Sequence, residues 1–295
     1  MYHYKCEYVL CIKSQFRGSS QTVSFFHCKE IEILNTAFSH QFGVRGGGLM
    51  IHKDCELLII KNSIFKQNLA ETAGAGLYCL GVKDIFIQYS KFYHNSAIRS
   101  IGGGAYFYNI NQIVLSNSEF YHNEGNNGGG FAAEKFKLAK VLNCEFQGNE
   151  GQSQGGGLYV HYDEKYENPV MGFITIFNTT FDSNDANKRG TAIVIISMHI
   201  KMFNFSQSSI GADERKNTSV SLIHLKVNSM ALNDISLIKI KSKTTVFNAI
   251  VRKVSRFTNI LFECPDNSYL KENSHSFLTD ILALHHYAAL NIQYK

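Results

Sequence analysis

Residues 102–123 read GGGAYFYNINQIVLSNSEFYHN, and this stretch decides the fold because its pattern recurs along the chain. It holds a triplet of small residues, a run of alternating apolar side chains, and a closing Phe120-x-x-Asn123. Small triplets begin at residues 46, 74, 102, 128 and 155, at intervals of 28, 28, 26 and 27. A repeat of this length is typical of a solenoid, in which each repeat forms one turn.

The end of each repeat carries a Phe followed three residues later by an Asn. The five pairs are Phe65 and Asn68, Phe92 and Asn95, Phe120 and Asn123, Phe146 and Asn149, and Phe181 and Asn184. Apolar residues recur seven and five positions before each Phe, which is the period of a β-strand. Helical spacing does not recur. The pattern therefore predicts an all-β fold, a parallel β-helix solenoid of about seven to ten coils.

Each repeated position has an expected role in such a coil. The Phe rings fill the core one above another, and the Asn side chains lie at the following turn, where amides can bond their counterparts in neighbouring coils. The Gly triplets serve corners that need a positive φ or leave no space for a Cβ. These ten Phe and Asn residues are therefore predicted to be structural.

The repeat also indicates where the domain ends. Residues 1–262 are predicted to form the β-helix, with regular repeats over about 10–210 and degenerate coils over 211–262. Within the last regular coil, Phe205 and Ser208 are expected at the Phe and Asn positions. The segment 263–295 breaks the strand pattern and is interpreted as a C-terminal cap or tail, with a short helix covering the end coil.

Composition narrows the class of protein. The chain has 295 residues, of which 44% are hydrophobic and 18% charged, so it can bury a sizeable core. Its net charge of +5 is spread without a Lys/Arg block, and we expect no nucleic-acid partner. The longest apolar run is too short to cross a bilayer, and no signal peptide is recognised. We therefore expect a chain that does not itself span a membrane, although it could belong to a longer, membrane-anchored one.

The seven cysteines form no pattern of metal ligands. They include no C-x-x-C pair and no zinc-like grouping. Cys79 and Cys144 fall at repeat positions that hold small or apolar residues in other coils, so we expect them to be buried thiols. The sequence predicts no cofactor.

The pairing of a Gly-Gly-small motif with Phe-x-x-Asn resembles the repeats of the chlamydial polymorphic outer-membrane proteins. More broadly, it resembles the right-handed parallel β-helix, or pectin-lyase-like, superfamily, and the large surface proteins of ciliates carry similar repeats. The resemblance covers roughly residues 10–210. It implies a right-handed solenoid, and the chlamydial family implies a role in adhesion.

Two small groups of residues are candidates for chemistry. Enzymes that cleave polysaccharides on this fold use two or three neighbouring carboxylates, and Asp182 and Asp185 are the pair that lies close in the sequence. His94 and His122 occupy the same repeat position and are candidate metal ligands. We favour the simpler interpretation of both groups, solvated turn carboxylates and a polar turn ladder.

The sequence thus predicts a non-catalytic surface or structural β-helix that binds a protein or glycan partner along its flank. We expect it at the cell surface or outside the cell. The alternative is a polysaccharide lyase or hydrolase that uses Asp182 and Asp185.

Overall fold

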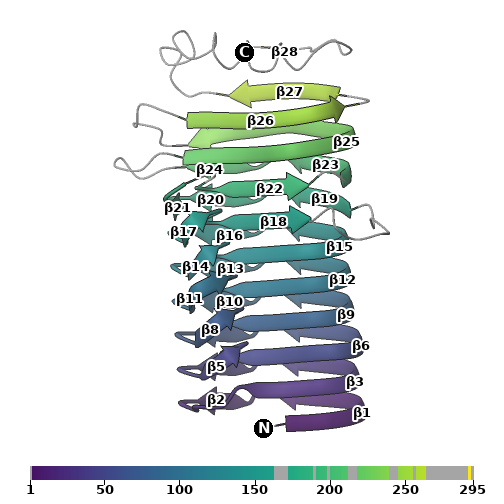
Figure 1. Cartoon of the computed structure of the whole chain (residues 1–295), viewed down its shortest axis with the longest axis vertical. Helices are drawn as coiled ribbons and strands as arrows, with labels where there is room; N and C mark the ends of the chain where they lie inside the picture. Colours follow the sequence, from purple (N-terminus) through teal and green to yellow (C-terminus); the bar gives the residue numbers. More distant parts are fainter. Residues whose placement is uncertain are drawn as a thin grey trace.

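The computed structural model describes residues 2–162, 172–188, 191–197, 200–211, 218–238, 245–254, 257–263 and 292–293. All regular elements in these ranges are β-strands, stacked in successive layers from the N-terminal end upward (Figure 1). None of the described segments is a helix long and apolar enough to cross a membrane. The predicted all-β parallel solenoid is confirmed.

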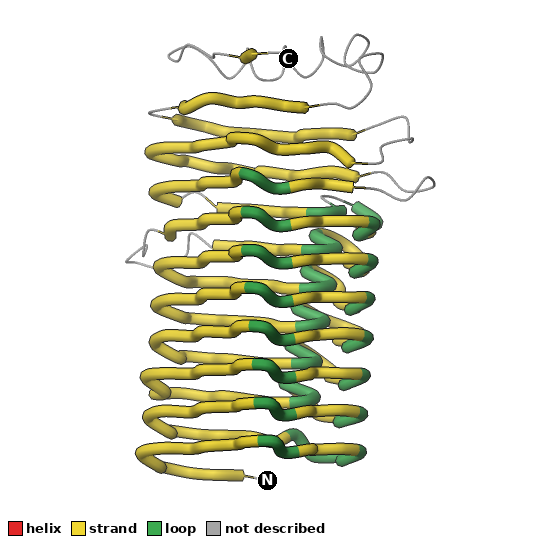
Figure 2. Tube along the Cα trace, turned by 180° about the vertical axis from the view of Figure 1, so that it is seen from behind, coloured by secondary structure: helices red, strands yellow, loops and turns green. Residues whose placement is uncertain are grey.

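One turn of the solenoid has three sides. Long strand β12 (Ala105–Ser116) leads into short strand β13 (Glu119–Tyr121), and then into β14 (Glu124–Asn127). The Gly triplet at residues 128–130 then carries the chain to β15 (Phe131–Leu142), directly above β12. The loops at these corners lie in vertical rows, one above another (Figure 2).

The remaining strands repeat these three sides. The other unbroken long strands are β1 (Tyr2–Ile12), β3 (Val23–Leu34), β6 (Leu49–Lys61) and β9 (Leu77–Gln88). In two further coils the long side consists of two strands, β18 (Leu158–Tyr162) with β19 (Gly172–Phe177), and β22 (Ile193–Ser197) with β23 (Ile200–Ser206). The short strands are β2 (Gln15–Arg17), β4 (Ala37–Ser39), β7 (Ile64–Lys66), β10 (Lys91–Tyr93), β16 (Glu145–Gln147), β20 (Thr180–Asp182) and β24 (Ser209–Gly211). The third side consists of β5 (Phe42–Arg45), β8 (Leu69–Ala73), β11 (Ser96–Ile101), β14, β17 (Glu150–Gln154) and β21 (Asp185–Ala186).

The described layers continue after these turns as β25 (Thr218–Ile238), β26 (Thr245–Val254), β27 (Phe257–Glu263) and β28 (Ile292–Gln293). The long and short strands form one parallel sheet, and the third side forms a second sheet of six strands, which corresponds to about six turns. Layers of the first sheet lie before and after these six turns. Of the predicted C-terminal cap or tail over 263–295, residues 264–291 lie outside the described residues, and Ile292–Gln293 forms β28.

The core contains a continuous file of phenylalanine rings. Phe92, Phe120 and Phe146 are fully buried and nearly parallel, with ring centroids 4.7 and 4.8 Å apart. The file extends in the same way from Phe16, through Phe38 and Phe65, to Phe181. Offset stacking of aromatic rings adds to the free energy gained by burying them.

A ladder of buried asparagines follows the phenylalanines. The side-chain oxygen of Asn123 accepts hydrogen bonds from the backbone N–H of Asn95 (3.1 Å) and from its side-chain amide (2.9 Å). The amide of Asn123 donates to the carbonyl of Phe92 at 2.9 Å. The same bonds recur from Asn68 to Asn184. The asparagine of each coil thus accepts hydrogen bonds from the buried N–H groups of the asparagine in the preceding coil.

The predicted alignment of Phe205 and Ser208 is wrong. Phe205 pairs with Ile176, and Ile210 takes the position opposite Phe181. Ser208 belongs instead to the ladder of small hydroxyl residues, because its Oγ accepts from the backbone N–H of Thr179 at 3.1 Å. The Phe205 ring still lies in the core and meets Phe181 edge-on.

Candidate functional site

The long strands bend near their middle, where their backbone leaves the extended conformation. At this point Gly81, Asn109 and Lys135 adopt left-handed backbone conformations, with φ of 67°, 57° and 53°. In β6 two consecutive residues, Lys53 and Asp54, do the same. A left-handed residue breaks the alternation of a strand, so the side chains on either side of it diverge.

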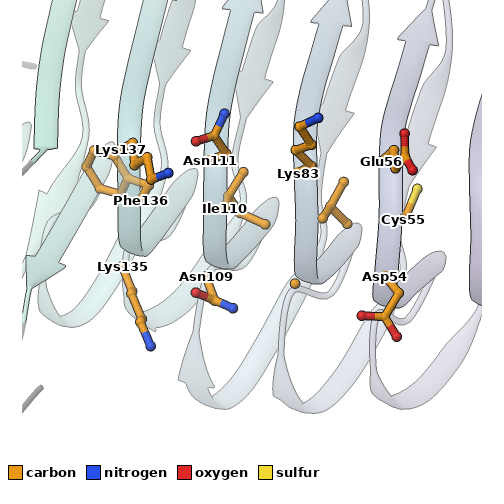
Figure 3. A pocket seen from close by; sticks show the side chains of 12 residues that line it. Asp54, Cys55, Glu56, Lys83, Asn109, Ile110, Asn111, Lys135, Phe136 and Lys137 are labelled. Atoms are coloured by element: carbon orange, nitrogen blue, oxygen red, sulfur yellow. The ribbon is translucent and has the colours of Figure 1, made fainter. Parts of the chain in front are cut away.

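A shallow, open groove of about 410 Å³ lies over this bend and crosses β6, β9, β12 and β15 (Figure 3). We call it the bend groove. Two rows of mainly polar residues border it, Asp54, Gly81, Asn109 and Lys135 on one side and Glu56, Lys83, Asn111 and Lys137 on the other. Between the rows lie the buried apolar residues Cys55, Val82, Ile110 and Phe136.

Charge is distributed unevenly along the bend groove. Asp54 and Glu56 lie at the β6 end, whereas Lys135 and Lys137 lie at the β15 end, as Figure 3 shows. Asp54 already pairs with His27 at 2.9 Å, and Asn111 donates from Nδ2 to Asp84 at 3.0 Å. The β6 end of the groove is therefore acidic and the β15 end basic.

Gly81 leaves the groove open at its centre. A Cβ at this position would meet only the Cα of Lys53, at 3.7 Å. The sequence analysis missed the bend groove because its residues differ from coil to coil and form no repeated motif. The signal was a glycine inside an otherwise regular strand, which often marks a bend or a bulge.

A second group of polar side chains lies on the outer face of the long strands before the bend. The Tyr106 hydroxyl donates to Glu134 at 3.0 Å, and His161 Nδ1 lies 3.7 Å from the other Glu134 oxygen. Burial, and then the charge of Glu134, raise the pKa of Tyr106 above its ordinary value. Tyr106 packs with Tyr78 and Tyr159 in a small apolar cluster, so this group stabilises the junction between the two sheets.

The two aspartates of the enzyme hypothesis lie on different sides of the solenoid. Asp182 ends short strand β20, whereas Asp185 begins β21 on the third side, with buried Asn184 between them. Asp182 accepts a hydrogen bond from Ser183 at 3.3 Å. Asp185 is in register with Glu150, which is in register with Glu124, so a third carboxylate does lie beside one member of the pair.

The two candidate histidines stack on each other. The rings of His94 and His122 are 5.3 Å apart and nearly parallel, and both residues have a positive φ. Partial burial, followed by His122 and Lys66, lowers the pKa of His94. Among the residues that the structure describes, no three His, Cys, Asp or Glu side chains are arranged to hold a metal ion.

Comparison with known protein families decides the classification. The family model described as a right handed beta helix region matches residues 2–211. The chain belongs to the right-handed β-helix family. No curated protein and no solved structure matches it. Membership of this family gives the fold and its handedness, while function depends on the individual surface of each member.

Proposed function

We propose that this β-helix protein is a non-catalytic binding module, displayed at a cell surface or outside the cell, that holds an extended glycan in the bend groove. The observation that carries the proposal is the groove itself, which crosses four successive long strands and is bordered by amide, carboxylate and ammonium groups. Adhesion would follow from attachment of the glycan to another surface.

The geometry of the groove suits a polymer. Successive coils lie about 4.8 Å apart, so a chain lying along the solenoid axis meets at least one new polar side chain at each step. The groove is open and mainly polar at its rims, unlike the enclosed apolar pockets that bind small hydrophobic molecules. A ligand rich in hydroxyl groups can hydrogen-bond to Asn109 and Asn111, and acidic groups can pair with the lysines.

Direct binding measurements test the proposal. Calorimetry with polygalacturonate, alginate and dextran should show binding of at least one polymer without cleavage. Lys83→Ala/Lys135→Ala/Lys137→Ala should weaken it about tenfold or more, because these ammonium groups border the groove. The matched control Lys61→Ala/Lys140→Ala/Lys188→Ala removes the same charge from residues that do not border it. Equal losses in both variants, or no binding by the unchanged protein, would overturn the proposal.

A second candidate function is polysaccharide cleavage at the two aspartates. The observation that favours it is Glu150, which pairs in register with Asp185 and adds a third carboxylate. Incubation with the same polymers tests it by the appearance of new reducing or unsaturated ends. Turnover that disappears in Asp182→Ala/Asp185→Ala would support an enzyme, and turnover that persists would exclude these residues.

A further inference from the structure

Cys6, Cys28 and Cys55 are free cysteines on successive long strands at the N-terminal end of the solenoid, and of these three only Cys55 lines the bend groove. Cys6 on β1 is in register with Cys28 on the adjacent parallel strand β3. Cys55 lies on β6, the next strand. Cys28 and Cys55 are 1% exposed, whereas Cys6 is only partly buried. A reagent from solvent therefore reaches Cys6 first.

The geometry favours one pair among the three. In-register residues on adjacent strands have Cα atoms about 4.8 Å apart, within the range of roughly 4.4–6.8 Å that disulfides span. Because residues in register on adjacent parallel strands face the same side of the sheet, the Cys6 and Cys28 side chains lie one above the other. By contrast, the pairing of β3 with β6 shifts register between Phe26 and Glu30, so Cys55 is not directly opposite Cys28. The Cys55 thiol donates to the carbonyls of Leu57 at 3.4 Å and Lys29 at 3.7 Å, and the Cys28 thiol donates to the Phe26 carbonyl at 3.5 Å.

The surroundings favour a neutral product. Burial, with the neighbouring Cys6 as the next cause, raises the pKa of Cys28 to about 12. Burial also raises the pKa of Cys55 to about 12. Thiolates, which metal binding requires, are costly in such a core. A disulfide carries no charge and replaces two thiols with little change in volume.

We propose that Cys6 and Cys28 form a redox-active pair that closes to a disulfide in the presence of a small-molecule disulfide such as oxidised glutathione. The Cys6 thiolate attacks the glutathione disulfide, which gives a Cys6–glutathione mixed disulfide and expels one glutathione thiolate. The Cys28 sulfur then attacks the Cys6 sulfur, its proton passes to solvent, and the second glutathione leaves. The two electrons of the protein thiols thus reduce one oxidised glutathione to two thiols.

Closure would fasten the first described layer of the solenoid to the second. Among the described strands, β1 pairs only with β3, so it is held by hydrogen bonds on one edge. A strand bonded along one edge opens more readily than one bonded along both. A covalent bond in the middle of β1 limits that opening and makes the stability of this first described layer depend on the redox state.

The experiment uses the full chain with oxidised glutathione, followed by proteolysis without reduction and mass spectrometry. We expect a Cys6–Cys28 cross-linked peptide two hydrogens lighter than the reduced pair. Amide hydrogen exchange in β1 should slow about tenfold or more and recover with dithiothreitol. A glutathione adduct that persists on Cys6 of the unchanged protein, or Cys28–Cys55 as the main product, would overturn the proposal.

Two variants separate the pair from general thiol reactivity. Cys28→Ala should leave Cys6 as a stable glutathione adduct, because the resolving thiol is absent. Cys11→Ala removes a partly buried thiol on the same strand that faces Ile33, and it should leave the cross-link unchanged. Loss of the cross-link in Cys11→Ala would point to a different pairing and contradict the assignment.

Discussion

The turn that carries Phe-x-x-Asn and the bend of the long strands have opposite characters. At the turn, Phe92, Phe120 and Phe146 are alike and fully buried, and the asparagines bond one another from coil to coil. At the bend, the corresponding residues of successive coils are Gly81, Asn109 and Lys135. Both sites hold left-handed residues, so backbone geometry alone does not force identity. Residues are alike where the side chains of one coil pack on, or hydrogen-bond to, those of the next coil. They vary where the side chains face solvent.

The largest effect should come from truncating a ring in the phenylalanine file. Phe120→Ala removes a fully buried ring stacked on both sides and should lower the free energy of unfolding by about 3–5 kcal/mol. Phe86→Ala, at a half-buried outward position on β9, should cost clearly less. Denaturant unfolding of both variants measures the difference. A loss below about 1 kcal/mol for Phe120→Ala would contradict the interior role of the file.

The next largest effect should come from the asparagine ladder. Asn123→Ala leaves the buried backbone N–H and side-chain amide of Asn95 without their acceptor, and should cost about 2–3 kcal/mol. Asn109→Gly keeps the left-handed conformation at the exposed bend and should change stability by less than about 0.5 kcal/mol. Thermal unfolding compares the two. Equal losses would show that the bend is as constrained as the turn.

Two glycines sharpen the comparison with one and the same substitution. Gly104→Asn places a Cβ against the backbone oxygen of Gly130, which leaves it no room, so we expect a loss of about 1–3 kcal/mol in the free energy of unfolding. Gly81→Asn introduces the residue that already occupies the next coil at Asn109, in open space, and should be nearly neutral. The free energies of unfolding of the two variants, measured with denaturant, test this difference. A destabilised Gly81→Asn would mean that the groove is not free to vary.

The smallest effect should be the pH dependence that His94 confers. Its folded-state pKa is lowered, so the unfolded chain takes up a proton first as the pH falls. Stability is therefore full above the ordinary histidine pKa of about 6.5 and declines as the pH falls through the lowered value. His94→Gln, which copies Gln67 of the preceding coil, should lose less stability between about pH 7.5 and 5 than the unchanged protein. A larger loss of stability in His94→Gln than in the unchanged protein would contradict a lowered pKa for His94.

Much of the fold could be predicted from residues that occupy one position in every coil. Phe92 and Phe120 revealed the inward file, since a parallel stack places equal residues over each other. The prediction failed at Phe205, where the repeat loses its triplet and spacing alone could not fix the register. The bend groove could not be predicted either, because its rows combine residues from four coils without a shared motif.

The sequence by itself determined the solenoid, because one coil can bury its apolar face only against an equal coil, and this requirement is written into the period of the repeat. The tertiary structure alone decided which variable side chains become neighbours. Lys83 and Lys137 border one groove, and Cys6 meets Cys28, only because stacking places residues a full coil or more apart side by side. Proximity of this kind depends on the exact register of the coils, which exposed residues do not encode.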